Sequence, residues 1–98
     1  MILVRDVFQA KYGRGDELIK LFQEIAQQME MGSGRRLLTD LSGPFFTIVT
    51  ETEAESVDAY FNQMREGFSR PEFGALFGRM QELVESGRRE FYTIEASS

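Results

Sequence analysis

The 98-residue sequence contains no cysteine, no histidine and no tryptophan. Without cysteine the chain can form no disulfide and carries no thiol nucleophile. Without histidine it lacks the commonest general base, the commonest metal ligand and the usual proximal ligand of haem iron. No catalytic or metal-binding motif stands out, so we expect neither a metal ion nor a cofactor.

Positive charge and long apolar runs are also scarce. Acidic residues outnumber basic ones by 16 to 11, which gives a formal net charge of −5. A nucleic-acid-binding surface needs clustered Lys and Arg, and we interpret Arg35-Arg36 and Arg88-Arg89 as solvated strand entrances. No apolar run approaches the roughly 18 residues of a membrane-spanning helix, and the N-terminus does not resemble a signal peptide. We therefore expect a cytoplasmic protein that binds neither nucleic acid nor membrane.

The residues that are present predict a single domain over residues 1–98. Apolar residues make up 42 % of the chain, with nine Phe, which suffices for a modest core. Residues 2–10 read as a strand and residues 12–15 as a turn. A helix then begins near Asp16 and ends at Gly32-Ser33-Gly34. Its apolar face consists of residues spaced three and four apart, namely Leu18, Leu21, Phe22, Ile25 and Met29.

The centre of the sequence is a predicted hairpin. Its arms are residues 35–41 and 45–51, separated by the turn residues Ser42-Gly43-Pro44. The patterns at residues 52–55 and 69–72 match capping boxes and predict two further helices, separated near Gly67. Ser86-Gly87 is expected to end the last helix, and residues 88–94 to form the last strand.

This order predicts an α+β, ferredoxin-like βαββαβ fold: a four-stranded antiparallel sheet, with the second helix broken in two. The helices can cover only one face of such a sheet. Yet apolar residues occupy both faces of the strands, as in Leu37 beside Leu38 and Phe45 beside Phe46. We therefore expect a homodimer that packs sheet against sheet into a barrel. The alternative is a monomer whose partly exposed face holds a ligand.

Several of these features together resemble the dimeric α+β barrel superfamily. They are the βαββαβ order, the hairpin TDLSGPFFTIVTE with the acidic segment after it, and the terminal Phe91-Tyr92-Thr93-Ile94. Within the superfamily, residues 2–95 are most similar to the antibiotic biosynthesis monooxygenase-like and NIPSNAP-like domains. The resemblance implies a homodimer with a pocket in each subunit between the helices and the sheet.

The resemblance also implies a choice of functions. Some members are cofactor-free monooxygenases that act on polycyclic aromatic molecules, others degrade haem, and others are binding or stress-response domains. The haem-degrading members use a His ligand with an Asn/Trp pair, and the monooxygenases use Asn and Trp. This sequence departs from both patterns, because Asn62 is its only match to these residues.

Three polar residues are candidates for chemistry. Asn62 lies beside an apolar helix stripe and is either a surface residue or a hydrogen-bonding group at a pocket mouth. Arg5 and Asp40 lie in apolar strand contexts, where a charge must be paired or shift its pKa. Together they would form an interface ion pair or a polar anchor for a carboxylate or phenolate ligand.

Aromatic and Met side chains could either fill an ordinary core or line a cavity for a flat apolar molecule. The candidates for such a pocket are Phe46, Tyr60, Phe61, Met64, Phe77 and Phe91. Two functions follow as hypotheses. One is a small cofactor-independent monooxygenase that acts on a small apolar or aromatic molecule. The other is a non-enzymatic dimeric ligand-binding or stress-response domain.

Overall fold

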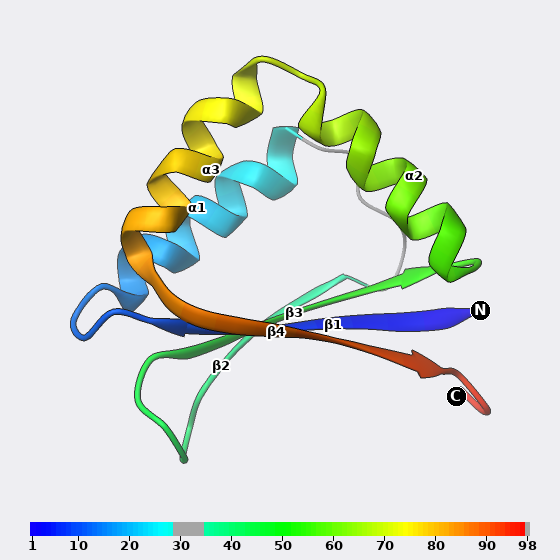
Figure 1. Cartoon of the computed structure of the whole chain (residues 1–98). Coiled ribbons are helices and arrows are strands. Elements are labelled where there is room, and N and C mark those ends of the chain that lie inside the picture. The colour runs from blue at the N-terminus through cyan, green and yellow to red at the C-terminus, as the bar shows by residue number, and fades with distance from the viewer. Residues whose placement is uncertain (29–34, 98) are drawn as a thin grey trace.

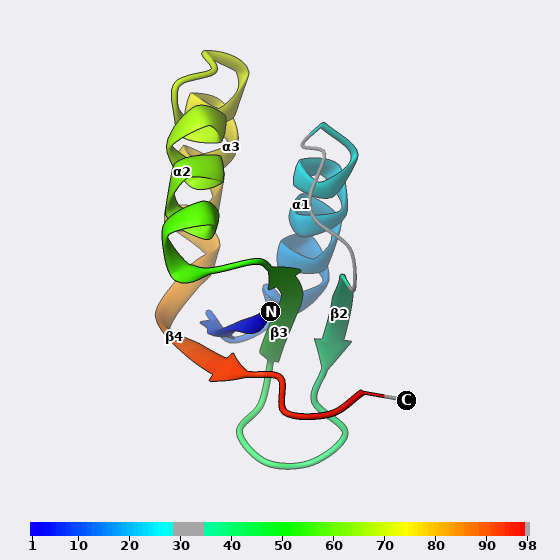
Figure 2. The same ribbon diagram turned by 90° about the vertical axis from the view of Figure 1, so that its right-hand side faces the viewer.

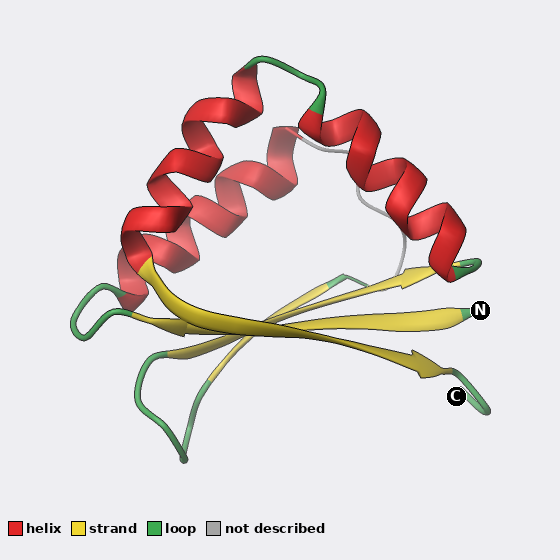
Figure 3. Cartoon of the chain, viewed as in Figure 1, coloured by secondary structure: helices red, strands yellow, loops and turns green. Residues whose placement is uncertain are grey.

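Three helices cover one face of a four-stranded antiparallel sheet in the computed structural model, which describes residues 1–28 and 35–97 (Figure 1, Figure 3). The strand order is β2-β3-β1-β4, so each helical crossover joins two strands that are consecutive in sequence but not adjacent in the sheet. The predicted ferredoxin-like α+β fold with its second helix in two pieces is confirmed. The elements are β1 (Ile2–Ala10), α1 (Gly15–Gln28), β2 (Arg36–Thr39), β3 (Thr47–Ala54), α2 (Val57–Phe68), α3 (Glu72–Leu83) and β4 (Val84–Thr93).

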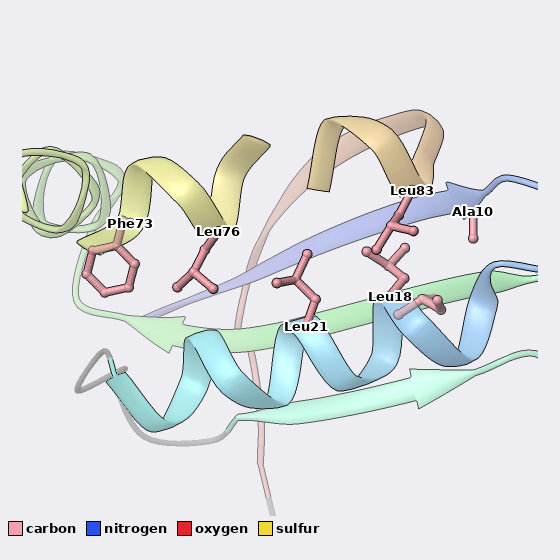
Figure 4. Packing of buried hydrophobic residues seen from close by; sticks show 7 residues of the cluster. Ala10, Leu18, Leu21, Phe73, Leu76 and Leu83 are labelled. Atoms are coloured by element: carbon pink, nitrogen blue, oxygen red, sulfur yellow. The ribbon is translucent and has the colours of Figure 1, made fainter. Parts of the chain in front are cut away.

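The apolar core lies between α1, α3 and the sheet. Leu18 and Leu21 of α1 and Phe73 of α3 are completely buried there, and Figure 4 shows these side chains lying in the space between the two helices, with strands of the sheet behind them. The helices α2 and α3 form an inverted V above the sheet, with α1 beside α3 (Figure 1). The core therefore occupies the end of the sheet under α1 and α3, and α2 returns to the sheet at the other end.

Neither predicted capping box starts a helix. Residues 52–54 continue β3, because Thr52 pairs with Val4 in the ladder with β1. The N-cap of α2 is Ser56, whose Oγ accepts a hydrogen bond of 3.1 Å from the N–H of Ala59. Ser69 instead ends α2, and its Oγ donates to the carbonyl oxygen of Glu66 at 2.7 Å.

The last strand begins earlier than expected. Ser86-Gly87 was expected to end a helix but lies inside β4, and α3 passes from Leu83 into β4 at Val84 with no residue between them. A Cβ at Gly87 would lie 3.3 Å from the Phe8 ring and from the Val7 carbonyl oxygen, so the glycine permits close approach of β1. The predicted helix end at Gly32-Ser33-Gly34, and Met29 before it, lie outside the described residues.

The central hairpin is looser than predicted, because β2 ends at Thr39 and β3 starts only at Thr47. Asp40 closes it. The Asp40 carboxylate accepts a hydrogen bond of 3.0 Å from the N–H of Thr47, and the Asp40 N–H donates to the Thr47 carbonyl at 3.1 Å. Phe46 has a positive φ of 60°, an uncommon conformation for a bulky residue, and its ring packs where a Gly15 side chain would stand.

The other sheet face, which we call the open face, has none of the described helices over it (Figure 1, Figure 2). Alternation along the strands places the odd-numbered residues of β1 on the open face, because Val4, Phe8 and Ala10 point toward the helices. Val7 and Val49 are only 9 % and 7 % exposed on it. Apolar residues thus occupy both faces of the sheet, as expected from the sequence.

Candidate functional site

A pocket of about 470 Å³ lies above the sheet, bounded by α1 on one side and by α2 and α3 on the other. Figure 2 shows the two walls standing apart over the strands. Its floor is the helix-facing side of β1 and β3. Most of its lining is aromatic, aliphatic or thioether, and the walls include Phe22, Ile25, Met64, Phe68, Phe77 and Met80. A mostly apolar cavity of this size is typical of a site for a small organic molecule.

An ion pair forms the polar part of the floor. Asp6 and Arg89 face each other across β1 and β4. The Arg89 Nε–H donates to Asp6 Oδ1 at 2.7 Å, and Nη2–H donates to Oδ2 at 3.3 Å. This two-point contact neutralises the arginine and fixes its orientation. The guanidinium carbon also lies 5.2 Å from the centre of the Tyr60 ring, within the range of a cation–π contact.

Tyr60 is held in its neutral form. The side chain is 4 % exposed and lines the pocket from α2. Burial, and then the negative charge of Asp6, raise the pKa of Tyr60 to about 12, although Arg89 acts in the opposite direction. The phenol therefore stays protonated at neutral pH and can act as a hydrogen-bond donor.

Thr52 adds a second hydroxyl to the pocket. Its Oγ1 is buried, yet none of the described residues offers it a hydrogen bond. A buried hydroxyl without a partner is costly, on the order of 1–3 kcal/mol. Because this oxygen is buried, the Thr52 side chain would have to rotate toward the cavity for its hydroxyl to bind an oxygen or nitrogen atom of a ligand. The floor thus combines a neutralised ion pair with an unpartnered hydroxyl.

At the start of β2 the pocket reaches Arg35, Arg36 and the buried Glu51. Arg36 forms an ion pair with Glu51, and Arg35 Nη1–H donates to the carbonyl oxygen of Ala26 at 3.2 Å. Strand alternation directs the Arg36 and Glu51 side chains to the open face, so these two residues bound the β2 edge of the pocket while their charges lie on the other side of the sheet.

The structure brings three of the six predicted pocket residues to this cavity, namely Tyr60, Met64 and Phe77. Phe61 and Phe91 do not line it. They stack edge-on against each other and against Tyr60, with ring centres 5.5 to 5.9 Å apart. Phe46 packs near the turn after β1, with its ring centre 5.2 Å from that of Tyr12.

The three polar candidates lie apart from the cavity lining and from one another. Asn62 is exposed on α2, and its Oδ1 accepts a hydrogen bond of 2.8 Å from Arg65. Arg5 projects from the open face toward Glu90, with Nε 3.6 Å from Oε1. Asp40 caps the hairpin at Thr47, which pairs with Gln9, four residues or roughly 13 Å along β1 from Arg5. No Arg5–Asp40 pair forms.

Sequence reasoning missed Arg89 and Thr52, which it assigned to a strand entrance and a capping box. A signal was present. Asp6 shares its parity with Val4 and Phe8, and Arg89 shares its parity with Phe91, so each lies on a strand face with large apolar residues. The mixed polarity of both strand faces obscured this signal.

The described residues contain neither a metal-binding cluster nor a membrane-spanning helix. No cluster of three or more His, Cys, Asp or Glu side chains in residues 1–28 and 35–97 could hold a metal ion. None of the helices in the same ranges is long and apolar enough to cross a membrane.

Comparison with known proteins identifies the fold. No protein-family model matches the sequence, and no curated protein is significantly similar to it. Solved structures do match. An uncharacterised NIPSNAP-domain protein from Burkholderia xenovorans superposes with a TM-score of 0.82 at 19 % identity, over 100 % of this chain and 98 % of the other.

Two further structures are oxygenase-like. A proposed antibiotic biosynthesis monooxygenase from Deinococcus radiodurans matches with a TM-score of 0.70 at 17 % identity, covering 100 % and 96 % of the two chains. A cofactor-independent oxygenase from Streptomyces nogalater matches with a TM-score of 0.70 at 15 % identity, covering 98 % and 94 %. At such identities the similarity establishes fold rather than activity. The chain has the ferredoxin-like α+β fold that NIPSNAP-domain proteins share with antibiotic biosynthesis monooxygenase-like proteins.

Proposed function

We propose that this protein binds a small, largely apolar and uncharged organic molecule in the pocket between its helices and sheet. The observation that carries the proposal is the pocket itself: about 470 Å³, walled by aromatic and Met side chains, with an unpartnered Thr52 hydroxyl on its floor. A flat molecule with one hydroxyl or carbonyl group would fill the apolar walls and give Thr52 a partner.

The floor favours a neutral ligand over an anion. Asp6 already neutralises Arg89. The same surroundings raise the pKa of the Tyr60 phenol to about 12, mainly through burial and the charge of Asp6. A phenol or enol bound beside Tyr60 would meet the same burial and the same carboxylate, so its ionisation is disfavoured in the same way.

Fluorescence titration with 2-naphthol tests this proposal, with 2-naphthoate as the charged counterpart. We expect 2-naphthol to bind and to raise the melting temperature, and 2-naphthoate to bind at least about tenfold more weakly. Replacement of Ala26 by Phe places a ring in the pocket and should abolish binding. Gly74→Ala, on the outer side of α3 with nothing within 4 Å, is the matched control. Equal binding to the parent and to Ala26→Phe would refute the assignment of the site.

The second candidate is cofactor-independent oxygenation of an aromatic ligand, which the fold similarity to the Streptomyces nogalater oxygenase favours. In this reaction O₂ converts a ring CH₂ to C=O, with the second oxygen atom leaving as water. Activation of O₂ by the substrate requires its carbanion, and Arg89 is the floor cation that could stabilise this negative charge once released from Asp6. Anthrone oxidation above the buffer rate, abolished in Arg89→Gln, would support this candidate, and no excess rate in the parent would exclude it.

We also propose that the chain forms a homodimer through the open face. Apolar side chains occupy this face without a described helix over it, including Leu3, Val7, Leu38, Val49 and Tyr92. Leu38 and Tyr92 are 37 % and 48 % exposed in the isolated chain. Burial of such side chains against a second copy would contribute roughly 25 cal/mol per Å² of apolar surface. Sedimentation velocity at micromolar concentration tests the dimer, and a stable monomer there would refute it.

A further inference from the structure

A row of four charged residues crosses the open face at one level. The strand register places Arg36 of β2 opposite Glu51 of β3, Glu51 opposite Arg5 of β1, and Arg5 opposite Glu90 of β4. Read across the sheet, the charges alternate as plus, minus, plus, minus. We call these four residues the charge row.

Contacts within the chain leave the charge row partly unsatisfied. Arg36, whose side chain is 65 % exposed, pairs with Glu51, which is only 5 % exposed in the isolated chain, and Glu90 pairs with Arg88 at 3.1 Å. Arg5 is the exception, because its only ion pair among the described residues is the 3.6 Å contact from Nε to Glu90. The Arg5 side chain is still 40 % exposed, and its Nε is buried without a hydrogen-bond partner among the described residues.

The alternating order has a consequence for self-association. Consider a two-fold axis that lies between two stacked sheets and runs parallel to their strands. It reverses the order of the strands, so β2 lies over β4 of the second copy and β3 lies over β1. Arg36 then faces Glu90, and Glu51 faces Arg5, each twice by symmetry. All four contacts join opposite charges.

Other symmetric arrangements lose this match. A two-fold axis that crosses the strands at the charge row preserves the strand order, so that Arg5 faces Arg5 and Glu51 faces Glu51. Like charges directly opposed across an interface cost affinity. The sign pattern therefore discriminates between two dimers that would bury the same apolar residues.

We propose that the charge row specifies the homodimer: a second copy of this chain docks on the open face about a two-fold axis parallel to the strands, with the partly free guanidinium of Arg5 beside Glu51 of the second copy. This inference rests on the proposed homodimer and goes beyond it by naming the residues that select the partner and its orientation. The apolar residues beside the row supply contact area, and the row supplies register, a role that polar groups fill in other interfaces.

Charge reversal in separate chains tests the proposal. In Arg5→Glu the row becomes plus, minus, minus, minus, and in Glu51→Arg it becomes plus, plus, plus, minus. Each variant opposes like charges across the axis, so we expect the dimer Kd of each alone to rise by more than about 100-fold. An equimolar mixture restores opposite charges at all four contacts, and its Kd should return to within about tenfold of the parent value. Arg14→Glu reverses a charge that pairs with Glu17 away from the sheet, and it should leave the Kd unchanged.

Near-UV circular dichroism shows whether each variant is folded, and 2-naphthol binding is a second check for Arg5→Glu, because Arg5 does not line the pocket. If the parent is a monomer, the proposed homodimer itself is wrong. If the parent is a dimer and the folded variants self-associate as tightly, the charge row lies outside the interface. Folded variants that stay monomeric when mixed would also overturn the proposal.

Cross-linking tests the direction of the axis, because the chain has no native cysteine to interfere. Leu38 and Arg88 occupy the two edge strands one level beyond the charge row. With the axis along the strands, Leu38 faces Arg88 of the second copy at about 10 Å, the usual spacing of stacked sheets. A short bismaleimide should therefore link Leu38→Cys to Arg88→Cys in a mixture far more than it links Leu38→Cys to itself. Preferential linking of Leu38→Cys to itself would refute the proposed direction of the axis.

Discussion

Replacement of Thr52 by Val should stabilise the protein, although it removes a polar group from a pocket. Val has nearly the shape of Thr and an equal preference for strands, so the substitution should preserve the packing and the ladder of β3 with β1. What changes is the buried Oγ1, which lacks a hydrogen bond among the described residues.

The expected gain follows from the cost of that hydroxyl. Burial of a hydroxyl without a partner costs about 1–3 kcal/mol in protein mutational data. The pocket is open to solvent at one end, so we expect the lower part of this range, a gain of about 1 kcal/mol. In a chain of 98 residues this corresponds to a rise in melting temperature of about 4–8 °C.

Thr47→Val is the matched control, because it makes the same chemical change in the same strand. The Thr47 hydroxyl has acceptors at 2.9 Å in the Pro44 carbonyl and at 3.1 Å in Gln9 Oε1. Its loss should therefore destabilise the protein by about 1 kcal/mol. We therefore expect Thr52→Val to be more stable than the parent and Thr47→Val to be less stable.

Urea unfolding followed by far-UV circular dichroism, at one protein concentration for all three proteins, measures both effects. The reasoning would be refuted if Thr52→Val were as unstable as Thr47→Val. That result would mean that the Thr52 hydroxyl is well bonded, and the ligand assignment would lose its polar contact. A stable Thr52→Val that also binds 2-naphthol about tenfold more weakly would support both parts of the argument.

Three further predictions address other parts of the molecule. Because the folded pKa of Tyr60 is raised to about 12, its contribution to stability is complete below about pH 10 and is lost as the pH rises toward 12. Between pH 10 and 12 the free energy of unfolding of the parent should thus fall by up to about 1.4 kcal/mol per pH unit more than that of Tyr60→Phe, as measured by urea unfolding. Gly78→Ala, on an open surface of α3, should raise the free energy of unfolding by about 0.5–1 kcal/mol. Gly15→Ala should lower it, because the new Cβ would lie 3.0 Å from the Phe46 ring. Thermal melts of both variants test these two predictions. Ser56→Ala should cost about 1 kcal/mol in the same melts through loss of the α2 N-cap, and an unchanged melting temperature would contradict that role.

Much of the fold could be predicted from the sequence, because most elements have strong local patterns. The strand at residues 2–10 and the apolar stripe of α1 matched the structure closely. The element boundaries near residues 52–56 and 84–87 did not. There, tertiary pairing overrides the local pattern, since Thr52 pairs with Val4 and Gly87 pairs with Phe8.

The candidate site was harder to predict, because it depends on how strands pair. The sequence alone shows that Asp6 and Arg89 are charged residues in strands. Only the register makes these two residues, which are 83 positions apart in the sequence, a pair on the pocket floor. Asp40 shows the reverse error, because a residue expected inside a strand lies just beyond β2 and bonds the backbone of the hairpin.

The direct passage from α3 into β4 connects the two faces of the sheet mechanically. Successive residues of β4 point to opposite faces, so Arg89 reaches the pocket and Glu90 reaches the charge row. An insertion of one residue between Leu83 and Val84 would have no loop to absorb it and would shift β4 by one position. Arg88 would then take the place of Arg89 opposite Asp6, and Arg89 would replace Glu90 opposite Arg5 on the open face. A single junction thus sets the sign of the charge row, and it should tolerate length changes far less than the connection at residues 40–46.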